Sequence, residues 1–547
     1  MKCLLVAVNA KYIHSNPAIM SLKAYYDKYS SAQAEVITCE YTINQQMDFI
    51  VSDIYEKQPN VVCFSCYIWN VEEIKYIADT LKKVMPKLKI WAGGPEVSYR
   101  AEEFLKCNSA FDGIMCGEGE KTFTNLMSAL EGKCGLKDIA GICYRAEEIK
   151  HNPMSEPMDM NEIPFIYEDL SDFENRIIYY ESSRGCPFSC SYCLSSIDKK
   201  LRFKDIQNVK KELSFFIDNK VKQIKFIDRT FNAKKNHAME IWSFIHENDN
   251  GITNFHFEVA ADLIDDEQLE LFKKMRPGLI QLEIGIQSTN AETITEINRT
   301  MNLDKVYRVI RVINSYGNIH QHVDLIAGLP YETLEIFKKS FNDVYALKCD
   351  QLQLGFLKVL SGSKMYDESN NYEIKYTSTA PYEVLSTKWI TYYDVIKLKQ
   401  IEEMVEIYYN SGQFKKTVEL LEIYYDNPFE LYEKLGEFYH NKFKQNEKHS
   451  RIARYELLLE FAKEEKIPVI NSLCECMTYD IYIRENCKKR PEFAIDLNDY
   501  KDKLKELYKK YSQSGKNIHI DIFDGKYVLF DYDERGVDGN AKAKICE

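Results

Sequence analysis

Residues 176–196 read RIIYYESSRGCPFSCSYCLSS, a short apolar stretch followed by three closely spaced cysteines. Cys186, Cys190 and Cys193 have a C-x3-C-x2-C spacing directly after what the pattern predicts to be a strand. A loop of this length can wrap three thiolates around one face of an iron–sulfur cube. Three thiolates leave one iron free to bind and reduce another molecule, whereas a pure electron carrier normally has four protein ligands. The stretch therefore predicts a [4Fe–4S] site that takes part in chemistry.

Strand and helix patterns alternate beyond this loop. Repeated βα units of this kind predict a full or partial TIM-like barrel over residues 177–360, with its active site at the carboxyl ends of the strands. After the strand that precedes the cysteines, further strands are expected at 224–228, 255–260, 279–287, 320–329 and 352–360.

Residues 1–140 show a similar alternation of short apolar runs and amphipathic stretches, beginning with KCLLVAV. Strand, helix and strand in repetition predict a doubly wound parallel sheet, whose ligands bind beyond the carboxyl ends of the strands. Residues 141–176 contain Pro153, Pro157 and Pro164, and this composition predicts a linker between the two domains.

After residue 360 the alternation stops, and the chain becomes charged, tyrosine-rich and helical in its periodicity. Residues 361–547 are therefore predicted to form a third, mostly helical domain. Asp524 and Gly525 separate two alternating runs and predict a terminal β-hairpin. The last segment, ERGVDGNAKAKICE, is expected to be a frayed tail. The predicted fold class is thus α/β for the first two domains and mostly helical for the third.

The composition narrows the class of protein. A chain of 547 residues is long enough for two or three domains. Its net charge of −13 argues against a surface that binds duplex nucleic acid, and it lacks the run of about eighteen apolar residues that a membrane span needs. The amino terminus, MKCLLVAVNAKY, lacks a signal-peptide cleavage site, and the 16 cysteines are expected to be free thiols in a reducing compartment. We therefore expect a cytoplasmic protein without a membrane partner.

The cysteine loop resembles that of the radical S-adenosylmethionine (SAM) superfamily. The shared features are the cysteine spacing, the aromatic Tyr192 just before the third cysteine, and the position after the first barrel strand. The resemblance covers about residues 180–360. It implies that the open iron binds SAM, near Tyr192, and that one electron cleaves SAM to a 5′-deoxyadenosyl radical. It also implies an electron donor such as flavodoxin or ferredoxin.

The resemblance further implies which strand ends contact SAM. In FIDRTFN, Asp228 is expected at the amino group of SAM, and in LEIGIQS, Glu283 and Gln287 are expected at the ribose. In DLIAGLPYE, Gly328 is expected to let the backbone approach the adenine. Each has a plainer explanation: Asp228 as a helix cap, Glu283 as a residue paired inside the barrel, and Gly328 as part of a turn.

Residues 1–140 resemble the cobalamin-binding domains that precede many radical SAM barrels. The resemblance implies cobalamin contacts from loops at the carboxyl ends of the strands, namely Tyr12, Ser65, Gly93, Gly94 and Glu118. Cobalamin domains with a histidine ligand carry Asp-x-His-x-x-Gly, whereas the loop around His14 lacks both the aspartate and the glycine. We therefore expect cobalamin without a histidine on cobalt, or a domain that keeps the fold without the cofactor.

Residues 370–515 resemble the uncharacterised helical carboxy-terminal extension that a bacterial subset of these proteins carries. This resemblance does not indicate a substrate. This part contains Cys474, Cys476 and Cys487. Their C-x-C-x10-C spacing does not fit the usual cluster or zinc patterns and predicts buried or incidental thiols rather than a second cluster.

Three functions remain open from the sequence. The first is a radical SAM enzyme in which cobalamin serves methyl transfer or a rearrangement. The second is a radical SAM enzyme without cobalamin, and the third is an iron–sulfur redox carrier or sensor without turnover. The open iron and the SAM contacts expected at successive strand ends argue against the third. No catalytic side chain and no substrate can be assigned from the sequence.

Overall fold

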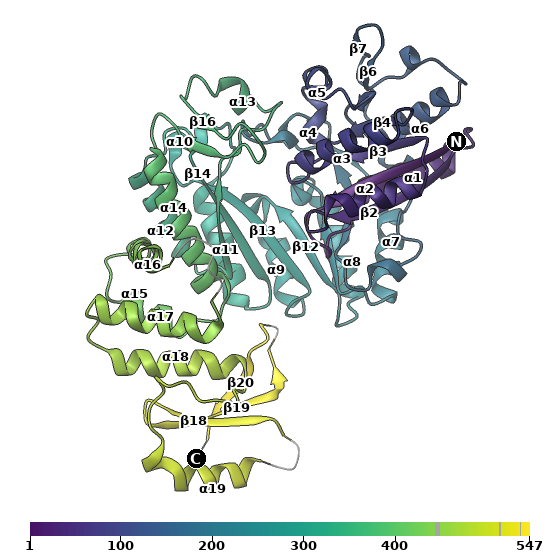
Figure 1. Ribbon diagram of the computed structural model, residues 1–547. Coiled ribbons are helices and arrows are strands. Elements are labelled where there is room, and N and C mark those ends of the chain that lie inside the picture. Colours follow the sequence, from purple (N-terminus) through teal and green to yellow (C-terminus); the bar gives the residue numbers. More distant parts are fainter. Residues whose placement is uncertain (444–448, 513–515, 537, 547) are drawn as a thin grey trace.

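The structure is a computed structural model that describes residues 1–443, 449–512, 516–536 and 538–546. Three units follow one another along the chain, coloured from purple through teal and green to yellow in Figure 1. Among the helices in these ranges, none is long and apolar enough to cross a membrane.

The amino-terminal unit is built on a seven-stranded sheet with the strand order β2-β1-β3-β4-β5-β6-β7. β1 to β5 run parallel, and an apolar core fills each face under the helices. This is the predicted doubly wound fold. Its elements are β1 (Lys2–Asn9), α1 (Pro17–Tyr29), β2 (Glu35–Thr42), α2 (Met47–Glu56), β3 (Val61–Ser65), α3 (Val71–Val84), β4 (Lys89–Gly93), α4 (Pro95–Ser98), α5 (Ala101–Cys107), β5 (Gly113–Met115) and α6 (Gly119–Leu130).

Part of the predicted linker belongs to this sheet. β6 (Ile142–Arg145) pairs antiparallel with β5, and β7 (Ile149–His151) pairs antiparallel with β6. Ile142 and Cys143 are completely buried. Burial of these apolar side chains stabilises the pairing of this stretch with the sheet, although prolines follow it. The connection to the barrel therefore begins after β7.

The middle unit is a partial barrel of six parallel strands in the order β15-β14-β13-β12-β11-β8. Apolar residues at every second strand position pack against the helices outside and form one continuous core. Its elements are β8 (Ile178–Tyr180), β9 (Ser183–Arg184), β10 (Arg202–Phe203), α7 (Ile206–Asp218), β11 (Gln223–Phe226), α8 (Lys235–Glu247), β12 (Asn254–Val259), α9 (Asp266–Lys274), β13 (Ile280–Gln287), α10 (Ala291–Glu296), α11 (Leu303–Tyr316), β14 (His320–Ala327), α12 (Leu334–Tyr345) and β15 (Gln351–Phe356).

Both edge strands of this open barrel are covered by the other units. Beside β8, the loop after β1 runs like an extra strand, because the Ile177 N–H donates to the Ile13 carbonyl at 2.8 Å. Beside β15, the Asn410 side chain accepts from the Leu352 N–H and donates to the Leu352 carbonyl, each at 2.8 Å. An unpaired strand edge invites other chains to pair with it, so these contacts complete the barrel.

Residues 357–390, which we call the cap, fold over the carboxyl end of the barrel and form a small apolar core there. The cap contains α13 (Lys364–Glu368), β16 (Lys375–Tyr376) and β17 (Val384–Ser386), and it reaches the amino-terminal unit. Tyr382 donates to the Glu96 carboxylate, and Arg100 donates to the Tyr366 hydroxyl. In Figure 1 the cap lies between the green helices and the purple unit.

The carboxy-terminal unit is mostly helical, as predicted, and its first helices pack against α12 and β15. It ends in a three-stranded sheet, because β20 pairs with β19 within the segment expected to be a frayed tail. That expectation is wrong, since Ala541 and Cys546 are buried against the hairpin. The elements are α14 (Tyr392–Val405), a π-helix (Glu406–Asn410), α15 (Lys415–Glu422), α16 (Pro428–Lys442), α17 (Arg451–Glu464), α18 (Ile470–Arg484), α19 (Lys501–Tyr511), β18 (Ile518–Phe523), β19 (Lys526–Arg535) and β20 (Ala541–Ile545).

Candidate active site

The three cysteines lie in the loop that follows β9. Cys186 and Cys190 are buried, Cys193 is half-buried, and all three are free thiols. The Cys186 N–H donates to the Asp198 carbonyl at 2.9 Å, and the Cys193 N–H donates to the Cys190 carbonyl at 3.2 Å, so the loop folds back on itself. Gly185 precedes it with φ 98°, and a Cβ there would lie 2.5 Å from a backbone oxygen of the returning chain. Glycine is therefore required at the turn.

The spacing of the three thiols along one loop allows a multi-iron cluster. Nowhere in the described part of the chain do three Cys, His, Asp or Glu side chains converge closely enough to hold one ion. A cube of four irons takes one thiolate at each of three corners, so its ligands need not converge on one point. The loop therefore fits the predicted cluster.

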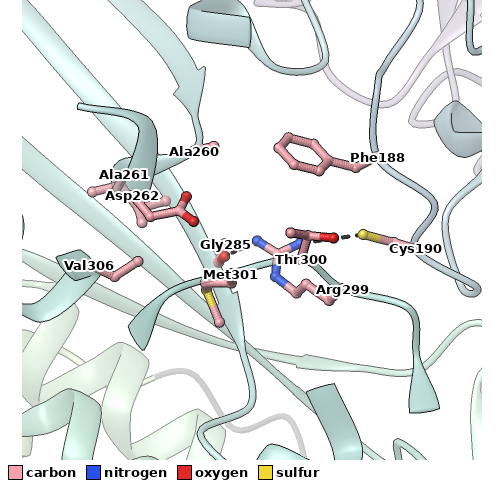
Figure 2. A pocket seen from close by; sticks show the side chains of 11 residues that line it. Phe188, Cys190, Ala260, Ala261, Asp262, Gly285, Arg299, Thr300, Met301 and Val306 are labelled. Atoms are coloured by element: carbon pink, nitrogen blue, oxygen red, sulfur yellow. Dashed lines mark hydrogen bonds between the residues drawn. The ribbon is translucent and has the colours of Figure 1, made fainter. Parts of the chain in front are cut away.

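A half-buried arginine that the sequence did not single out lies over this loop. The Arg299 guanidinium donates to Cys190 Sγ at 3.6 Å, to the Tyr192 hydroxyl at 3.2 Å and to the Gly285 carbonyl. Figure 2 shows it between β13 and the cysteine loop, with Phe188 across the pocket. Its positive charge offsets the negative charge that thiolate ligands bring. No local sequence pattern identifies Arg299, because only the fold brings it to the cysteine loop.

Gln287 ends β13 next to this arginine. Its backbone is left-handed, with φ 72°, where the pairing of β13 with β14 shifts by a residue. Its side chain lies over Gly285, since a Cβ on Gly285 would be 2.2 Å from Gln287 Nε2. The Gln287 Oε1 atom is buried and accepts no hydrogen bond from the described residues. A buried polar atom without a partner costs free energy, so this oxygen is available to a ligand.

Glu283 lies deeper on the same face of β13. Its carboxylate forms ion pairs with Lys225 Nζ at 3.0 Å and His256 Nε2 at 2.9 Å. Burial opposes ionisation, but the neighbouring His256 ring and the charge of Lys225 outweigh it and hold the pKa of Glu283 at about 2. This geometry favours pairing inside the barrel over a contact with the ribose.

Asp228 follows β11 and is completely buried. Its carboxylate accepts hydrogen bonds from the Ser182 N–H at 3.0 Å, the Ser182 hydroxyl at 2.7 Å and the Ser183 hydroxyl. Burial raises the pKa of Asp228 to about 6. Through these hydrogen bonds Asp228 anchors the chain that leads into the cysteine loop, and its contact with the amino group of SAM stays a prediction.

Gly328 allows another group to approach its backbone closely, and in this structure that group is the side chain of Val384. It has φ 89°, and a Cβ on it would lie 2.8 Å from Cγ1 of Val384 in β17. The cap therefore packs on one side of Gly328, and the contact of its backbone with adenine stays a prediction. Tyr192, the other expected SAM contact in this region, packs against the same apolar core and offers its hydroxyl to Arg299.

Glu118 joins the two units instead of facing a ligand. Its carboxylate forms ion pairs with Arg202 at 2.6 Å and Arg184 at 3.4 Å, and it accepts from the Met158 N–H at 2.7 Å. Arg184 and Arg202 belong to β9 and β10, the strands that flank the cysteine loop. The carboxyl edge of the amino-terminal sheet is thereby held against the carboxyl end of the barrel. The expected cobalamin contact at Glu118 is therefore not supported.

Tyr12 is also displaced from the expected site. It is 71% exposed, and it lines an outer groove between α1 and residues 164–176. The structure does not bring it to the other expected cobalamin contacts.

Those other contacts lie together at the ends of β3 and β4. Ser65 is buried and pairs in register with Gly93, and a Cβ on Gly94, which has φ 110°, would lie 2.3 Å from a backbone oxygen of the loop after β3. In that loop the Tyr67 and Trp69 rings stack at 4.4 Å with an interplanar angle of 6°, and Trp69 is 41% exposed. A flat, exposed aromatic surface beside closely packed glycines fits a planar macrocycle such as a corrin.

His14 lies in the loop after β1, where this edge of the sheet meets the barrel. Its Nδ1 is 2.6 Å from the Tyr179 hydroxyl oxygen, on the first barrel strand. Burial and the nearby charges of Lys11, Lys225 and Arg176 lower its pKa. The contact with Tyr179 uses one ring nitrogen only, so the case against His14 as a cobalt ligand rests on the missing aspartate and glycine of the Asp-x-His-x-x-Gly pattern.

The three cysteines of the carboxy-terminal unit lie on or just after one helix. Cys474 and Cys476 are on α18, where Cys474 is buried and Cys476 half-buried, and Cys487 follows the helix. Helix neighbours two positions apart point to different sides, so these thiols do not share one face.

Three families match the chain, one for each unit. Residues 4–127 match the B12 binding domain, and residues 180–344 match the Radical SAM superfamily. Residues 370–526 match a protein family of unknown function, DUF4080. The chain thus carries a B12 binding domain and a radical SAM domain, and the cap lies at the start of the DUF4080 segment.

Two curated relatives match more than half of the chain. The uncharacterized methyltransferase PH0819 of Pyrococcus horikoshii is 25% identical over 368 residues, which cover 64% of this chain and 79% of that protein. The cobalamin-dependent radical SAM methyltransferase TokK of Streptomyces tokunonensis is 25% identical over 338 residues, which cover 56% of this chain and 48% of TokK. The chain therefore spans about half the length of TokK.

Solved structures share the fold. The cobalamin-dependent SAM radical enzyme OxsB, with aqua-cobalamin and SAM bound, has a TM-score of 0.61 at 16% identity, over 94% of this chain and 82% of that chain. The radical SAM methyltransferase TsrM from Kitasatospora setae, with cobalamin and a [4Fe–4S] cluster bound, has a TM-score of 0.56 at 15% identity, over 66% of this chain and 76% of that chain. The predicted fold class is confirmed.

Proposed function

Since this chain is a radical SAM protein with an amino-terminal B12 binding domain, we propose that it transfers a methyl group from SAM, by way of cobalamin, to a substrate held in the barrel. Its cofactors are a [4Fe–4S] cluster, SAM and cobalamin. Two relatives named as methyltransferases favour methyl transfer over rearrangement.

One observation carries this proposal: the carboxyl ends of both parallel sheets face each other across the cysteine loop. The ion pairs of Glu118 with Arg184 and Arg202 tie the two edges together. Ligands of open α/β sheets and of barrels bind at those ends, so two ligands bound there would be neighbours. A methyl group that passes between two cofactors requires this proximity.

Each set of residues has a separate role in the proposal. Cys186, Cys190 and Cys193 hold the cluster, and Asp228 fixes the chain that enters their loop. Arg299 compensates charge beside Cys190. When bound, the cluster supplies the electron that cleaves SAM, and cobalamin supplies the methyl-carrying metal.

Two further sets of residues hold the organic cofactors. The unpartnered Gln287 Oε1 accepts a hydrogen bond from SAM next to the cysteine loop. Ser65, Gly93 and Gly94 leave room for cobalamin, and the exposed Trp69 ring lies against it. His14 is not proposed as a cobalt ligand, because its loop lacks the aspartate and the glycine of the Asp-x-His-x-x-Gly pattern.

The reaction needs a reductant, as radical SAM enzymes do. We propose flavodoxin or ferredoxin as the donor and the cytoplasm as the location, since 16 cysteines and an oxygen-sensitive cluster suit a reducing compartment.

The test is anaerobic reconstitution of the full chain with iron, sulfide and hydroxocobalamin, followed by SAM and a strong reductant. We expect about one four-iron cluster and one corrin per chain, 5′-deoxyadenosine, and S-adenosylhomocysteine whose formation requires cobalamin. The matched control is the C186A/C190A/C193A variant, which should lose the iron and keep the corrin.

Three outcomes separate the alternatives. A loaded cluster without 5′-deoxyadenosine would favour a redox carrier or sensor. Formation of 5′-deoxyadenosine without retention of any corrin would favour a radical SAM enzyme without cobalamin. Unchanged iron content in the triple variant would exclude the three cysteines as ligands.

A further inference from the structure

The inner face of this open, six-stranded barrel is polar, unlike the packed interior of a closed eight-stranded TIM barrel. The inward layers of such closed barrels are filled mainly by Val, Ile and Leu. Here every inner-face residue of β11, β12 and β13 is polar, charged or glycine, while the alternate residues form the apolar core outside. Neighbouring strands align these residues in layers, with Lys225 opposite Tyr179 and His256, and Glu283 opposite Glu258 and His322.

Most of the charged groups in these layers lie within ion-pair distance of a group of opposite charge, although His256 Nε2, His322 Nε2 and Asp324 Oδ1 lack a well-aligned hydrogen bond in the described structure. Glu283 pairs with Lys225 and His256, as described above, and His322 Nε2 lies 3.1 Å from Asp324 Oδ1. Burial opposes the charged form of His322, but the neighbouring Asp324 carboxylate raises its pKa overall. Each of these pairs joins opposite charges, so neither attracts a further charged ligand.

Glu258 is different. It is half-buried, and in the described ranges it forms neither a hydrogen bond nor an ion pair. The charged groups that face it are Glu283, Arg229, Lys225 and Asp324. Lys225 is paired with Glu283. Arg229 lowers the pKa of Glu258 by its charge but forms no ion pair with it in the described ranges. Glu283 and Asp324 repel a further carboxylate. Burial and these acidic neighbours raise the pKa of Glu258 to about 7.

We infer, on the basis of the proposed function, that the substrate carries a cationic nitrogen, an ammonium or guanidinium, which Glu258 binds on the inner face of the barrel. A carboxylate held in partly desolvated surroundings gains most from a donor that is itself charged. An apolar substrate, such as a hydrocarbon skeleton or a flat macrocycle, would displace water from Glu258 and the groups around it without replacing the lost hydrogen bonds. This desolvation costs free energy. Glu258 is thus a specificity-determining residue.

The experiment uses the reconstituted full chain and three probes of one size: n-butylammonium, butyrate and n-butanol. Binding is measured by ligand-observed nuclear magnetic resonance at pH 7, with and without saturating SAM, and without reductant. We expect n-butylammonium to bind at least about tenfold more tightly than the other two probes, with or without SAM. The E258Q variant should lose this preference. E267Q, which changes an exposed glutamate on α9, is the matched control and should keep it.

Three results would overturn the inference. Equal binding of the three probes, or a preference retained in E258Q with normal iron content, would remove Glu258 from substrate recognition. Displacement of n-butylammonium by SAM would show that the ammonium of SAM itself occupies the site. Since no SAM is cleaved in this titration, it can fail while 5′-deoxyadenosine is still formed, so the two proposals fail separately.

Discussion

The Nη1 atom of Arg299 lies 3.6 Å from the Sγ atom of Cys190. Hydrogen bonds to cluster sulfurs and nearby charge set the reduction potential of iron–sulfur centres. A cation fixed at this distance stabilises the reduced, more negative state of a bound cluster. Arg299, which is hydrogen-bonded to the Gly285 carbonyl of β13, is therefore expected to raise the reduction potential of the cluster.

We predict that Arg299→Met lowers the midpoint potential of the cluster, on the order of 60 mV, which corresponds to about 1.4 kcal/mol for one electron. Arg299→Lys, which keeps the charge, should lower it less. The measurement is a redox titration followed by electron paramagnetic resonance, at equal iron content. Arg308→Met, on the exposed face of α11, is the control. An unchanged potential in Arg299→Met would show that this cation does not act on the cluster.

Gln287 and Glu283 should respond differently to substitution, although both lie on the inner face of β13. Gln287→Ala should weaken SAM binding by about 1–3 kcal/mol, because a ligand would lose a buried partner. Glu283→Gln should leave SAM affinity within about threefold, because its carboxylate already binds Lys225 and His256. Equilibrium dialysis with radiolabelled SAM measures both effects. The reverse order of effects would place the nucleoside deeper in the barrel.

Glu332 should make stability depend on pH. It is completely buried after β14, where its Oε1 accepts from the Ser288 hydroxyl at 2.6 Å and its Oε2 has no partner in the described structure. Burial raises its pKa to about 8. The folded state therefore binds this proton more tightly than the unfolded state does, so the contribution to stability is complete below about pH 4 and is lost as pH rises to 8.

Glu332→Gln removes that dependence. Relative to the wild type, the variant should gain about 1.4 kcal/mol of stability per pH unit between pH 5 and pH 8. Thermal unfolding midpoints at three pH values test this, with the exposed Glu335→Gln as the control. A difference between variant and wild type that stays constant with pH would contradict the prediction.

Asn410→Ala should loosen the outer edge of β15. The change removes both hydrogen bonds to the Leu352 backbone, at a cost of about 1–3 kcal/mol. Hydrogen exchange measured by mass spectrometry should show faster exchange in peptides that contain Leu352. Asn441→Ala, at an exposed position of α16, should leave it unchanged. Equal protection in both variants would mean that α14 alone covers this edge.

Much of the architecture follows from local pattern. The predicted strand 279–287 differs from β13 by one residue, and the expected hairpin turns at Asp524 and Gly525, both with positive φ. Such features depend on alternation and turn chemistry, which neighbouring residues determine. The cysteine loop is likewise local, so its spacing could be recognised without the fold.

Contacts stay unpredicted where a partner lies far along the chain. Gly328 meets Val384 of the cap, and Glu118 meets Arg202, and neither neighbour is visible from the motif itself. Arg299 was missed for the same reason, because only the folded barrel brings it over Cys190. Strand periodicity places a residue on a face, whereas its partner depends on tertiary packing.

The coverage of the two barrel edges has a consequence for biosynthesis. A growing chain leaves the ribosome from its amino terminus, so the stretch that pairs with β8 is already made when β8 emerges. The residues that cover the outer edge of β15 come later in the chain. This edge therefore remains unpaired until α14 and the π-helix that ends at Asn410 have been translated. During that interval the nascent barrel can pair with other extended chains. A premature stop codon just after β15 would make this transient hazard permanent.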